Sequence, residues 1–219
     1  MEEDIRWINL GFVNAYLLKA NDGYILIDTG IAQSWSRLKN ELRRAGALPD
    51  RLKLVVLTHG DFDHSGNCAG LQSQYHAQVA IHPGDAEIVK TGLALKRTAR
   101  SLPGKLFVRL TGLMRGSFHT FQPDVLLEDG QDFSQYGLAA RVIYTPGHTR
   151  GSIAVLTDSG HLFIGDTFGN NRKLSRADYV QNEQELQKSI QRLQGLQASM
   201  VYPGHGEPFA FEKLSRIES

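Results

Sequence analysis

Cysteine is almost absent from this chain, with Cys68 the only one among 219 residues. An intramolecular disulfide is therefore excluded, and so is a cysteine-rich metal site. Any metal ion would have to be held by histidine and carboxylate side chains. The length fits one domain and is sufficient to bury a core without disulfides. We predict a single domain over residues 1–219, with Cys68 as a small buried core residue.

An excess of either charge is also lacking, because 24 lysines and arginines stand against 23 aspartates and glutamates, for a net charge of +1. A whole-protein electrostatic footprint for nucleic acid is therefore not expected. Wholly apolar runs such as residues 54–57 are far too short to cross a bilayer. The start of the chain, residues 1–7, is acidic where a secretory signal would be basic. We predict no nucleic-acid partner, no membrane span and a cytoplasmic location.

Acidic residues are missing altogether from residues 88–122, which hold seven basic side chains. The rest of the chain consequently has an excess of acid, so a basic segment is carried on an acidic body. Several leucines supply this segment with apolar surface, and we interpret it as a mostly helical insertion interrupted near Pro103. Its charge favours a small anionic substrate, although a simply solvated charged face is the alternative.

Short apolar runs bounded by turn residues predict a mixture of strands and helices. Strands are expected at 11–20, 24–28, 53–58, 78–82, 138–145, 152–157, 161–164 and 200–202, and helices at 33–45, 66–75, 181–196 and 211–217. Both halves of the chain are rich in strands and end in a helix. This order favours two sheets packed together with helices outside.

The strongest functional signal is the sequence Thr-His-Gly-Asp-Phe-Asp-His at residues 58–64. Two imidazoles and two carboxylates follow directly after a predicted buried strand. Such a cluster would be unfavourable inside a core if nothing bound to it. Histidine and aspartate together suit Zn²⁺, Fe or Mn²⁺. The segment therefore predicts a metal site at the end of a strand.

Three later segments place the same residue types after strands: Tyr-Thr-Pro-Gly-His-Thr at 144–149, Ile-Gly-Asp-Thr at 164–167 and Tyr-Pro-Gly-His-Gly at 202–206. Proline fixes φ and glycine permits a positive φ, so each Pro-Gly turn is sharp and rigid. A rigid turn suits a metal ligand that must be held in place. His76, His82, His119 and His161 match none of these segments and are expected to be ordinary surface histidines.

These segments, taken in order with Asp28 at the end of an earlier strand, resemble the metallo-β-lactamase-fold superfamily. Its marks are a strand ending in Asp, then His-x-His-x-Asp-His, then a later His, Asp and His. The resemblance implies an α+β fold, a four-layer αββα sandwich of the metallo-β-lactamase type, with two divalent metal ions at one edge. Zinc is the metal expected first, with iron or manganese as alternatives.

The resemblance also assigns roles to individual residues. The first metal would be bound by His59 and His148, and the second by Asp63, His64 and His205. Asp166 would bridge the two metals, and Asp63 and Asp166 would be the catalytic carboxylates. Asp28 would accept a hydrogen bond from a ligand and fix its orientation.

One position departs from the family pattern, because Asp61 stands where a histidine is usual. We predict that Asp61 is a ligand of the first metal, with a capping role as the alternative. A related branch, the flavin-associated di-iron oxygen and nitric oxide reductases, carries a carboxylate at this station. Asp61 therefore bears on the identity of the first metal and leaves the second site untouched.

The function implied is a metal-dependent hydrolase. A hydroxide shared by two metal ions would attack an ester, thioester, lactone or amide bond of a small molecule. Three alternatives stay open: an iron-dependent oxidoreductase, a phosphodiesterase, and a non-catalytic binding protein on the same fold. The substrate and the oligomeric state are not determined by the sequence.

Overall fold

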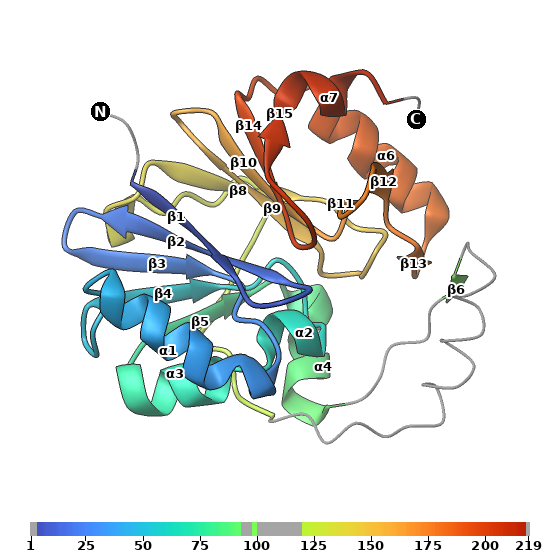
Figure 1. Cartoon of the computed structure of the whole chain (residues 1–219). Coiled ribbons are helices and arrows are strands. Elements are labelled where there is room, and N and C mark those ends of the chain that lie inside the picture. The colour runs from blue at the N-terminus through green and yellow to red at the C-terminus, as the bar shows by residue number, and fades with distance from the viewer. Residues whose placement is uncertain (1–3, 93–97, 100–119, 218–219) are drawn as a thin grey trace.

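The computed structural model describes residues 4–92, 98–99 and 120–217. Two large β-sheets lie face to face, and helices cover their outer faces (Figure 1). The first sheet has the order β1-β2-β3-β4-β5-β7 and the second has the order β15-β14-β10-β9-β8. The first sheet contains β1 (Ile5–Asn9), β2 (Asn14–Ala20), β3 (Gly23–Ile27), β4 (Leu52–Val56), β5 (Gln78–Ile81) and β7 (Val125–Leu126). The second contains β8 (Ala140–Tyr144), β9 (Ile153–Thr157), β10 (His161–Gly165), β14 (Met200–Pro203) and β15 (Phe209–Ala210).

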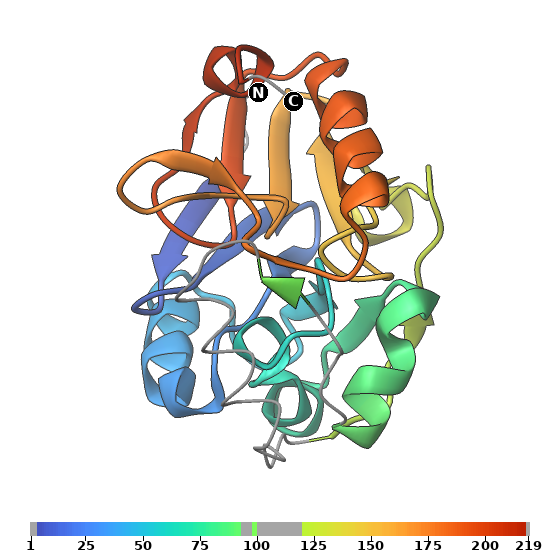
Figure 2. The same ribbon diagram turned by 90° about the vertical axis from the view of Figure 1, so that its right-hand side faces the viewer.

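Two short strand pairs and the helices complete the described structure. Strands β11 (Phe168–Asn170) and β12 (Leu174–Arg176) pair with each other, as do β13 (Tyr179–Val180) and β6 (Thr98–Ala99). The helices are η1 (Ala32–Ser34), α1 (Trp35–Arg44), α2 (Phe62–Ser65), α3 (Cys68–Tyr75), α4 (Pro83–Thr91), η2 (Ser134–Tyr136), α6 (Glu183–Gln194) and α7 (Phe211–Ser215). Figure 2 shows α6 and α7 against one sheet, and α1, α3 and α4 against the other.

Three hydrophobic cores lie between the four layers. One joins the first sheet to α1 and α3, through residues such as Leu26 and Leu38. The second lies between the sheets and includes Ile25 and Phe163, and the third joins the second sheet to α6 through residues such as Ile190. The neighbouring residues Ile25 and Leu26 belong to different cores because side chains alternate between the two faces of a strand. The predicted αββα sandwich is confirmed.

Parallel pairing brings several strand ends to one edge. Strands β3, β4 and β5 are mutually parallel, and β10 is parallel to β14. The carboxyl ends of parallel strands therefore meet at a common edge, which is where open sheets of this kind place ligands. The segments after β3, β4, β10 and β14 are those that carry Asp28, residues 58–64, Asp166 and His205.

The strand predictions differ from the structure at the margins. The predicted strand at 11–20 begins only at Asn14, because Gly11 has a φ of 111° and opens a turn. The strand β1 and the short strands β11, β12, β13 and β15 were not expected. A two- or three-residue strand has too few residues to show an alternating pattern.

The basic segment 88–122 lies largely outside the described residues. Its first residues belong to α4, which ends at Thr91, and Thr98–Ala99 form strand β6 where a helix was expected. The pairing of Thr98 with Val180 explains this, since β6 adds to β13. The rest of the segment's helical prediction, including the interruption near Pro103, falls on residues that are not described. The single domain over 1–219 stays a prediction. Across residues 4–92, 98–99 and 120–217, no helix is both long and apolar enough to cross a membrane.

Candidate metal centre

Two imidazoles and one carboxylate form what we call the first cluster: His59, Asp61 and His148. The carboxylate oxygen Oδ2 of Asp61 lies 3.3 Å from Nε2 of His59 and 3.2 Å from Nε2 of His148. Both histidines are buried, and they come from opposite sheets, since His59 follows β4 and His148 follows β8. The predicted position of Asp61 among the first-site residues agrees with this geometry.

A second cluster has the same composition: Asp63, His64 and His205. The carboxylate oxygen Oδ2 of Asp63 lies 3.4 Å from Nε2 of His205 and 3.9 Å from Nε2 of His64. In each cluster the candidate ligand atoms lie within 4.8 Å of one another, which suits a single metal ion. His64 is fully buried on α2, whereas the side chain of His205 is 21% exposed.

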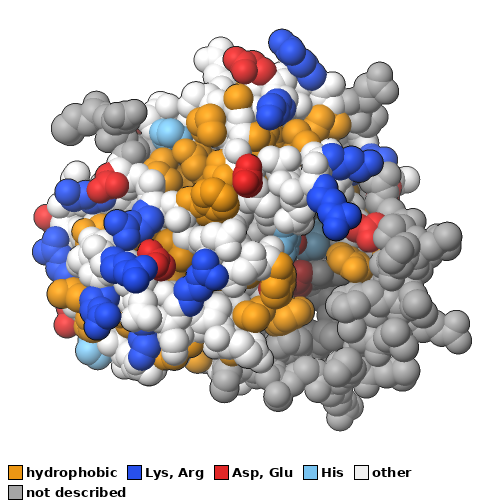
Figure 3. Space-filling model, viewed as in Figure 1, with side chains coloured by type: hydrophobic (Ala, Val, Ile, Leu, Met, Phe, Trp, Pro, Cys, Tyr) orange, Lys and Arg blue, Asp and Glu red, His pale blue; other side chains and the backbone are white. Residues whose placement is uncertain are grey.

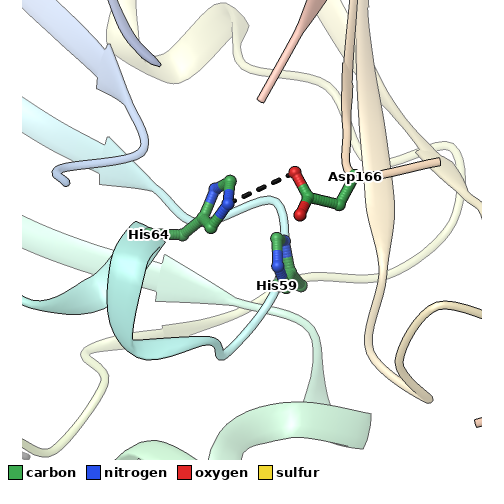
Figure 4. Close-up of side chains that lie close together, drawn as sticks. All are labelled: His59, His64 and Asp166. Carbon is green, nitrogen blue, oxygen red and sulfur yellow. Dashed lines mark ion pairs between the residues drawn. The ribbon is translucent and has the colours of Figure 1, made fainter. Parts of the chain in front are cut away.

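Asp166 lies between the two clusters. Its Oδ1 is 3.3 Å from Nε2 of His64, and its Oδ2 is 3.1 Å from Nε2 of His205 and 3.8 Å from Nε2 of His148. One carboxylate therefore reaches imidazoles of both clusters. Figure 4 shows Asp166 extending from the second sheet toward His59 and His64, which come from the loop and helix after β4.

Gly204 explains how the last ligand turn passes so close to Asp166. A Cβ atom at position 204 would lie 2.2 Å from Oδ1 of Asp166 and 2.7 Å from Cε1 of His64. Both distances are shorter than any tolerated contact, so only glycine fits there. The Pro-Gly turn at 203–204 thus lets the backbone carry His205 alongside the other ligands.

Asp28 organises one histidine of each cluster. Its Oδ2 lies 2.8 Å from Nδ1 of His64 and accepts a 2.7 Å hydrogen bond from the hydroxyl of Thr58. The same hydroxyl lies 3.0 Å from Nδ1 of His59, and it can accept there because its own proton goes to Asp28. Nδ1 is therefore the protonated nitrogen of His64 and His59. Their Nε2 atoms are therefore the ones that face the clusters.

The other two histidines are supported in the same way by backbone carbonyls. Nδ1 of His148 donates to the carbonyl oxygen of Tyr179 over 2.7 Å, and Nδ1 of His205 donates to that of Phe12 over 2.5 Å. All four imidazoles thus direct Nε2 toward the centre. An Nδ1 held by a hydrogen-bond acceptor, with Nε2 directed to the metal, is the usual arrangement of histidine ligands. Thr58, Tyr179 and Phe12 were not found from the sequence, because a backbone or hydroxyl acceptor leaves no residue-type signal.

The charges of the cluster residues depend on one another. Burial lowers the pKa of His64 and His205, but the nearby carboxylates, Asp166 foremost, together outweigh burial and raise the pKa of His64 well above 6.5 and that of His205 to about 10. Burial raises the pKa of Asp166, but nearby His205 and His64 outweigh this and hold its pKa well below 3.8. Protons and metal ions consequently compete for the same nitrogen atoms.

The donor set fits a metal ion. Nε2 of His59, Nε2 of His64 and Oδ1 of Asp166 are buried and make no hydrogen bond within the part of the chain that the structure describes. Buried polar atoms without a partner are rare and costly. Metal coordination would satisfy all three, since nitrogen and carboxylate oxygen are ligands that zinc and its neighbours accept.

The histidines set aside by the sequence lie away from the clusters. His76 pairs with Asp50 on the surface, His82 caps α4, and His161 contacts the Tyr202 hydroxyl at 2.9 Å. His119 lies outside the described residues. Cys68 is fully buried, as predicted.

A comparison with protein families identifies the chain. Residues 8–205 match the model of the metallo-beta-lactamase superfamily. The chain belongs to this superfamily. This chain is 28% identical over 226 residues to the probable metallo-hydrolase YflN of Bacillus subtilis, and the match covers 93% of this chain and 84% of that protein. It is 30% identical to the human acyl-coenzyme A thioesterase MBLAC2, covering 99% of this chain and 83% of that protein.

Two further similarities were found, one to a relative and one to a solved structure. The chain is 32% identical to the probable polyketide biosynthesis zinc-dependent hydrolase BaeB of Bacillus velezensis, over 70% of this chain and 56% of that protein. Among solved structures, the subclass B3 metallo-beta-lactamase BJP-1 of Bradyrhizobium japonicum has a TM-score of 0.71 at 20% identity, covering 93% of this chain and 75% of that one. This last similarity shows the shared fold. The protein is a metal-dependent hydrolase of the metallo-β-lactamase superfamily.

Proposed function

We propose that the two clusters form a dinuclear metal centre that hydrolyses a carboxylic acid derivative of a small molecule. His59, Asp61 and His148 would hold the first metal, and Asp63, His64 and His205 the second. Asp166 would be shared between them, with Asp28 orienting His59 and His64. The observation that carries this proposal is the place of Asp166, within 3.8 Å of imidazoles from both clusters.

Each residue then has a defined task. When bound, divalent cations such as zinc would act as Lewis acids and supply an activated water as nucleophile near neutral pH. The carboxylates of Asp61, Asp63 and Asp166 would compensate three of the four positive charges of two such cations. One positive charge remains, which favours an anionic ligand or transition state. The hydrogen bonds at Nδ1 keep the imidazoles fixed while this charge changes.

The surroundings of the centre suit a substrate with an apolar and an anionic part. Asp61, Asp63 and Asp166 have side chains 14–16% exposed, so solvent and substrate can reach them. The ring of Phe12 is stacked on His205, with centroids 6.0 Å apart, and Phe12 is 53% exposed. Figure 3 shows histidine and acidic side chains at a hollow bordered by hydrophobic and basic ones.

We therefore propose an acyl thioester as the substrate class to test first, ahead of simple esters, lactones and amides. The exposed aromatic surface at Phe12 offers a contact for an acyl chain. The relative MBLAC2, a named acyl-coenzyme A thioesterase, is 30% identical over nearly the whole chain, which supports this choice.

The test combines metal analysis with a substrate panel. Purified protein should contain up to two divalent metals per chain, mainly zinc. It should hydrolyse acyl thioesters faster than matched oxygen esters, lactones and phosphodiesters. Asp166→Ala, purified in parallel, is the control for contaminating hydrolases. Activity that survives complete metal removal, or that is equal in Asp166→Ala, would contradict the proposal.

A second candidate, an iron-dependent oxidoreductase, is favoured by Asp61 alone. Its carboxylate lies within 3.3 Å of both first-cluster imidazoles, where the family usually has a histidine. An oxygen ligand is harder than imidazole and suits iron or manganese. Iron as the main metal, a coloured protein and oxygen consumption with an electron donor would replace the hydrolase proposal with this one.

A further inference from the structure

Asp85 is a fully buried carboxylate that lies outside both clusters and outside the superfamily signature segments discussed above. It is in the first turn of α4, which follows β5 and begins at Pro83. Its side chain accepts three hydrogen bonds: from the backbone N–H of Gly60 at 2.8 Å, the hydroxyl of Thr149 at 2.6 Å and the backbone N–H of Gly151 at 2.9 Å. Within the described residues these partners are all neutral donors, so no cation pairs with this buried carboxylate.

The three donors are placed on the two loops that carry the first cluster. Gly60 lies between His59 and Asp61, and Thr149 follows His148 directly. The first loop belongs to the first sheet and the second loop to the second sheet. One carboxylate therefore ties together the two halves of the first cluster. Asp63 and His64 lie on α2, which begins directly after Asp61, and none of the hydrogen bonds of Asp85 goes to the segments that carry His205 or Asp166.

The backbone around Asp85 is also closely packed. A Cβ atom at Gly151 would lie 2.6 Å from Cγ of Asp85, and one at Gly84 would lie 2.7 Å from the carbonyl oxygen of Arg150. Glycine at both positions allows α4 to approach the 149–151 turn. Thr149 is also fixed from its other side, because its backbone N–H donates to the hydroxyl of Ser152 over 3.0 Å. Asp85, α4 and the 149–151 turn are thus closely packed and joined by hydrogen bonds.

We infer that Asp85 is a positioning residue for the first metal, which it controls by fixing the separation of the His59–Asp61 loop from His148. The inference rests on the proposed assignment of the first cluster as a metal site. Small displacements matter, because metal ligands must lie within a few tenths of an ångström of their proper distances. Loss of Asp85 should consequently weaken the first site, where two of its partners adjoin the ligand residues, more than the second site.

The variant Asp85→Asn tests this with little change in volume. One end of the amide is a donor, so it cannot accept all three hydrogen bonds. Metal-free protein is titrated with Co²⁺, followed by calorimetry and visible absorption. Asp61→Ala and Asp63→Ala identify which binding event belongs to which cluster. We expect Asp85→Asn to weaken the event that Asp61→Ala removes by about ten- to a hundredfold, and to weaken the other event clearly less.

Asp124→Asn is the matched control. Asp124, an exposed residue just before β7, also accepts from a backbone N–H, that of Val79 at 2.8 Å, and from the Gln72 side chain, and these hydrogen bonds involve no ligand loop. It should bind Co²⁺ as the wild type does. If Asp85→Asn fails to fold, Thr149→Val removes one of the three hydrogen bonds and should weaken the first event in the same direction, by less.

Two outcomes would overturn the inference. One is wild-type affinity at both sites in Asp85→Asn and in Thr149→Val. The other is equal weakening of both events together with a lower melting temperature of the metal-free protein, which would mean a general structural role. Neither outcome bears on hydrolysis, so failure of the proposed function would appear separately, as a wild-type protein that binds metal without cleaving the substrate panel.

Discussion

The first and second clusters contain the same side chains, two imidazoles and one aspartate each, yet they are held in different ways. In the second cluster, Nδ1 of His64 contacts the carboxylate of Asp28 directly. In the first cluster, Nδ1 of His59 contacts the Thr58 hydroxyl and Nδ1 of His148 contacts a backbone carbonyl. A carboxylate partner makes an imidazole a stronger ligand than a neutral acceptor does.

From this comparison we infer that the support of the ligand residues, as well as donor type, would set the properties of each site. The first cluster depends on two loops from opposite sheets, and its geometry is fixed through their backbones. Each cluster takes two members from residues 58–64 and one from a turn of the second sheet, but those of the second cluster, Asp63 and His64, are adjacent on α2, whereas His59 and Asp61 lie on the loop before it. We expect the second cluster to bind metal more tightly and the first to be the more easily altered.

Removing Asp166 should have the largest effect, because it is shared by both clusters. In Asp166→Ala each site loses an oxygen ligand, and repulsion between two cations is less compensated. We expect a loss of activity of at least about a hundredfold, and less metal at both sites. Turnover and metal content of the purified variant check this. Two metals per chain with normal turnover would show that Asp166 is not shared.

Removing the charge of Asp28 should separate the clusters. Asp28→Asn weakens the acceptor for His64 directly and that for His59 only through Thr58. We expect metal affinity to fall about ten- to a hundredfold at the second site and by less at the first. Stepwise metal titration measures both.

Asp50→Asn is the control for Asp28→Asn. Asp50 likewise contacts a histidine Nδ1, that of His76 at 2.9 Å, and it shares the positive φ of Asp28, 66° against 57°. Asparagine tolerates this backbone conformation, so any effect of the backbone should be equal in the two variants. An equal loss of metal at both sites in Asp28→Asn, or any loss in Asp50→Asn, would contradict the different support of the two clusters.

Changing Asp61 to histidine should make the first cluster more like that of the usual family pattern. Asp61→His replaces a hard oxygen by nitrogen, so zinc should be favoured over manganese and iron by about tenfold. It also adds one positive charge to the centre, so the group whose ionisation limits the rate should lose its proton at lower pH. Metal preference and the pH profile of turnover, measured side by side with the wild type, test both points. If neither changes, Asp61 does not bind the metal.

The candidate ligand residues could be picked out from the sequence because each follows a strand and belongs to an ordered set. His59, His64, Asp166 and His205 come together because parallel pairing aligns their strands at one edge. Residue type and order are enough to find such groups. The two sheets could be predicted in the same way, because their longer strands are apolar runs of five to seven residues separated by polar turns.

The supporting residues could not be predicted in this way. Asp85 is an ordinary residue type for the first turn of a helix, and its role depends on Gly60 and Thr149, which are far away in the sequence. The carbonyl groups of Phe12 and Tyr179 could belong to any residue. Strand β6 depends on pairing with β13, some 80 residues later, so no local pattern near Thr98 indicates it.

The smallest effect is expected at an exposed ion pair near the end of β8, the strand that leads to the His148 turn. Arg192 on α6 donates to the carbonyl oxygen of Tyr144, just before the His148 turn, and lies 3.0 Å from the carboxylate of Asp129. Both side chains are more than 40% exposed. Arg192→Ala should therefore lower the free energy of unfolding by no more than about 1 kcal/mol at neutral pH and leave both metal sites unchanged.

The pH dependence of that effect has a definite sign. Burial raises the pKa of Asp129, but hydrogen bonds from Arg192 and from the Tyr144 backbone outweigh it, so its pKa in the folded protein lies below 3.8. A lowered pKa means that the pair stabilises the fold above pH 3.8 and that this contribution disappears as the pH falls further. The difference in unfolding free energy between wild type and Arg192→Ala should thus be constant from pH 7 to about pH 4 and shrink at lower pH. Chemical denaturation of the metal-free proteins across this range measures it. A difference that grows in acid, or a change in metal binding at the first site alone, would show that Arg192 supports the His148 turn by another route than its pairing with Asp129.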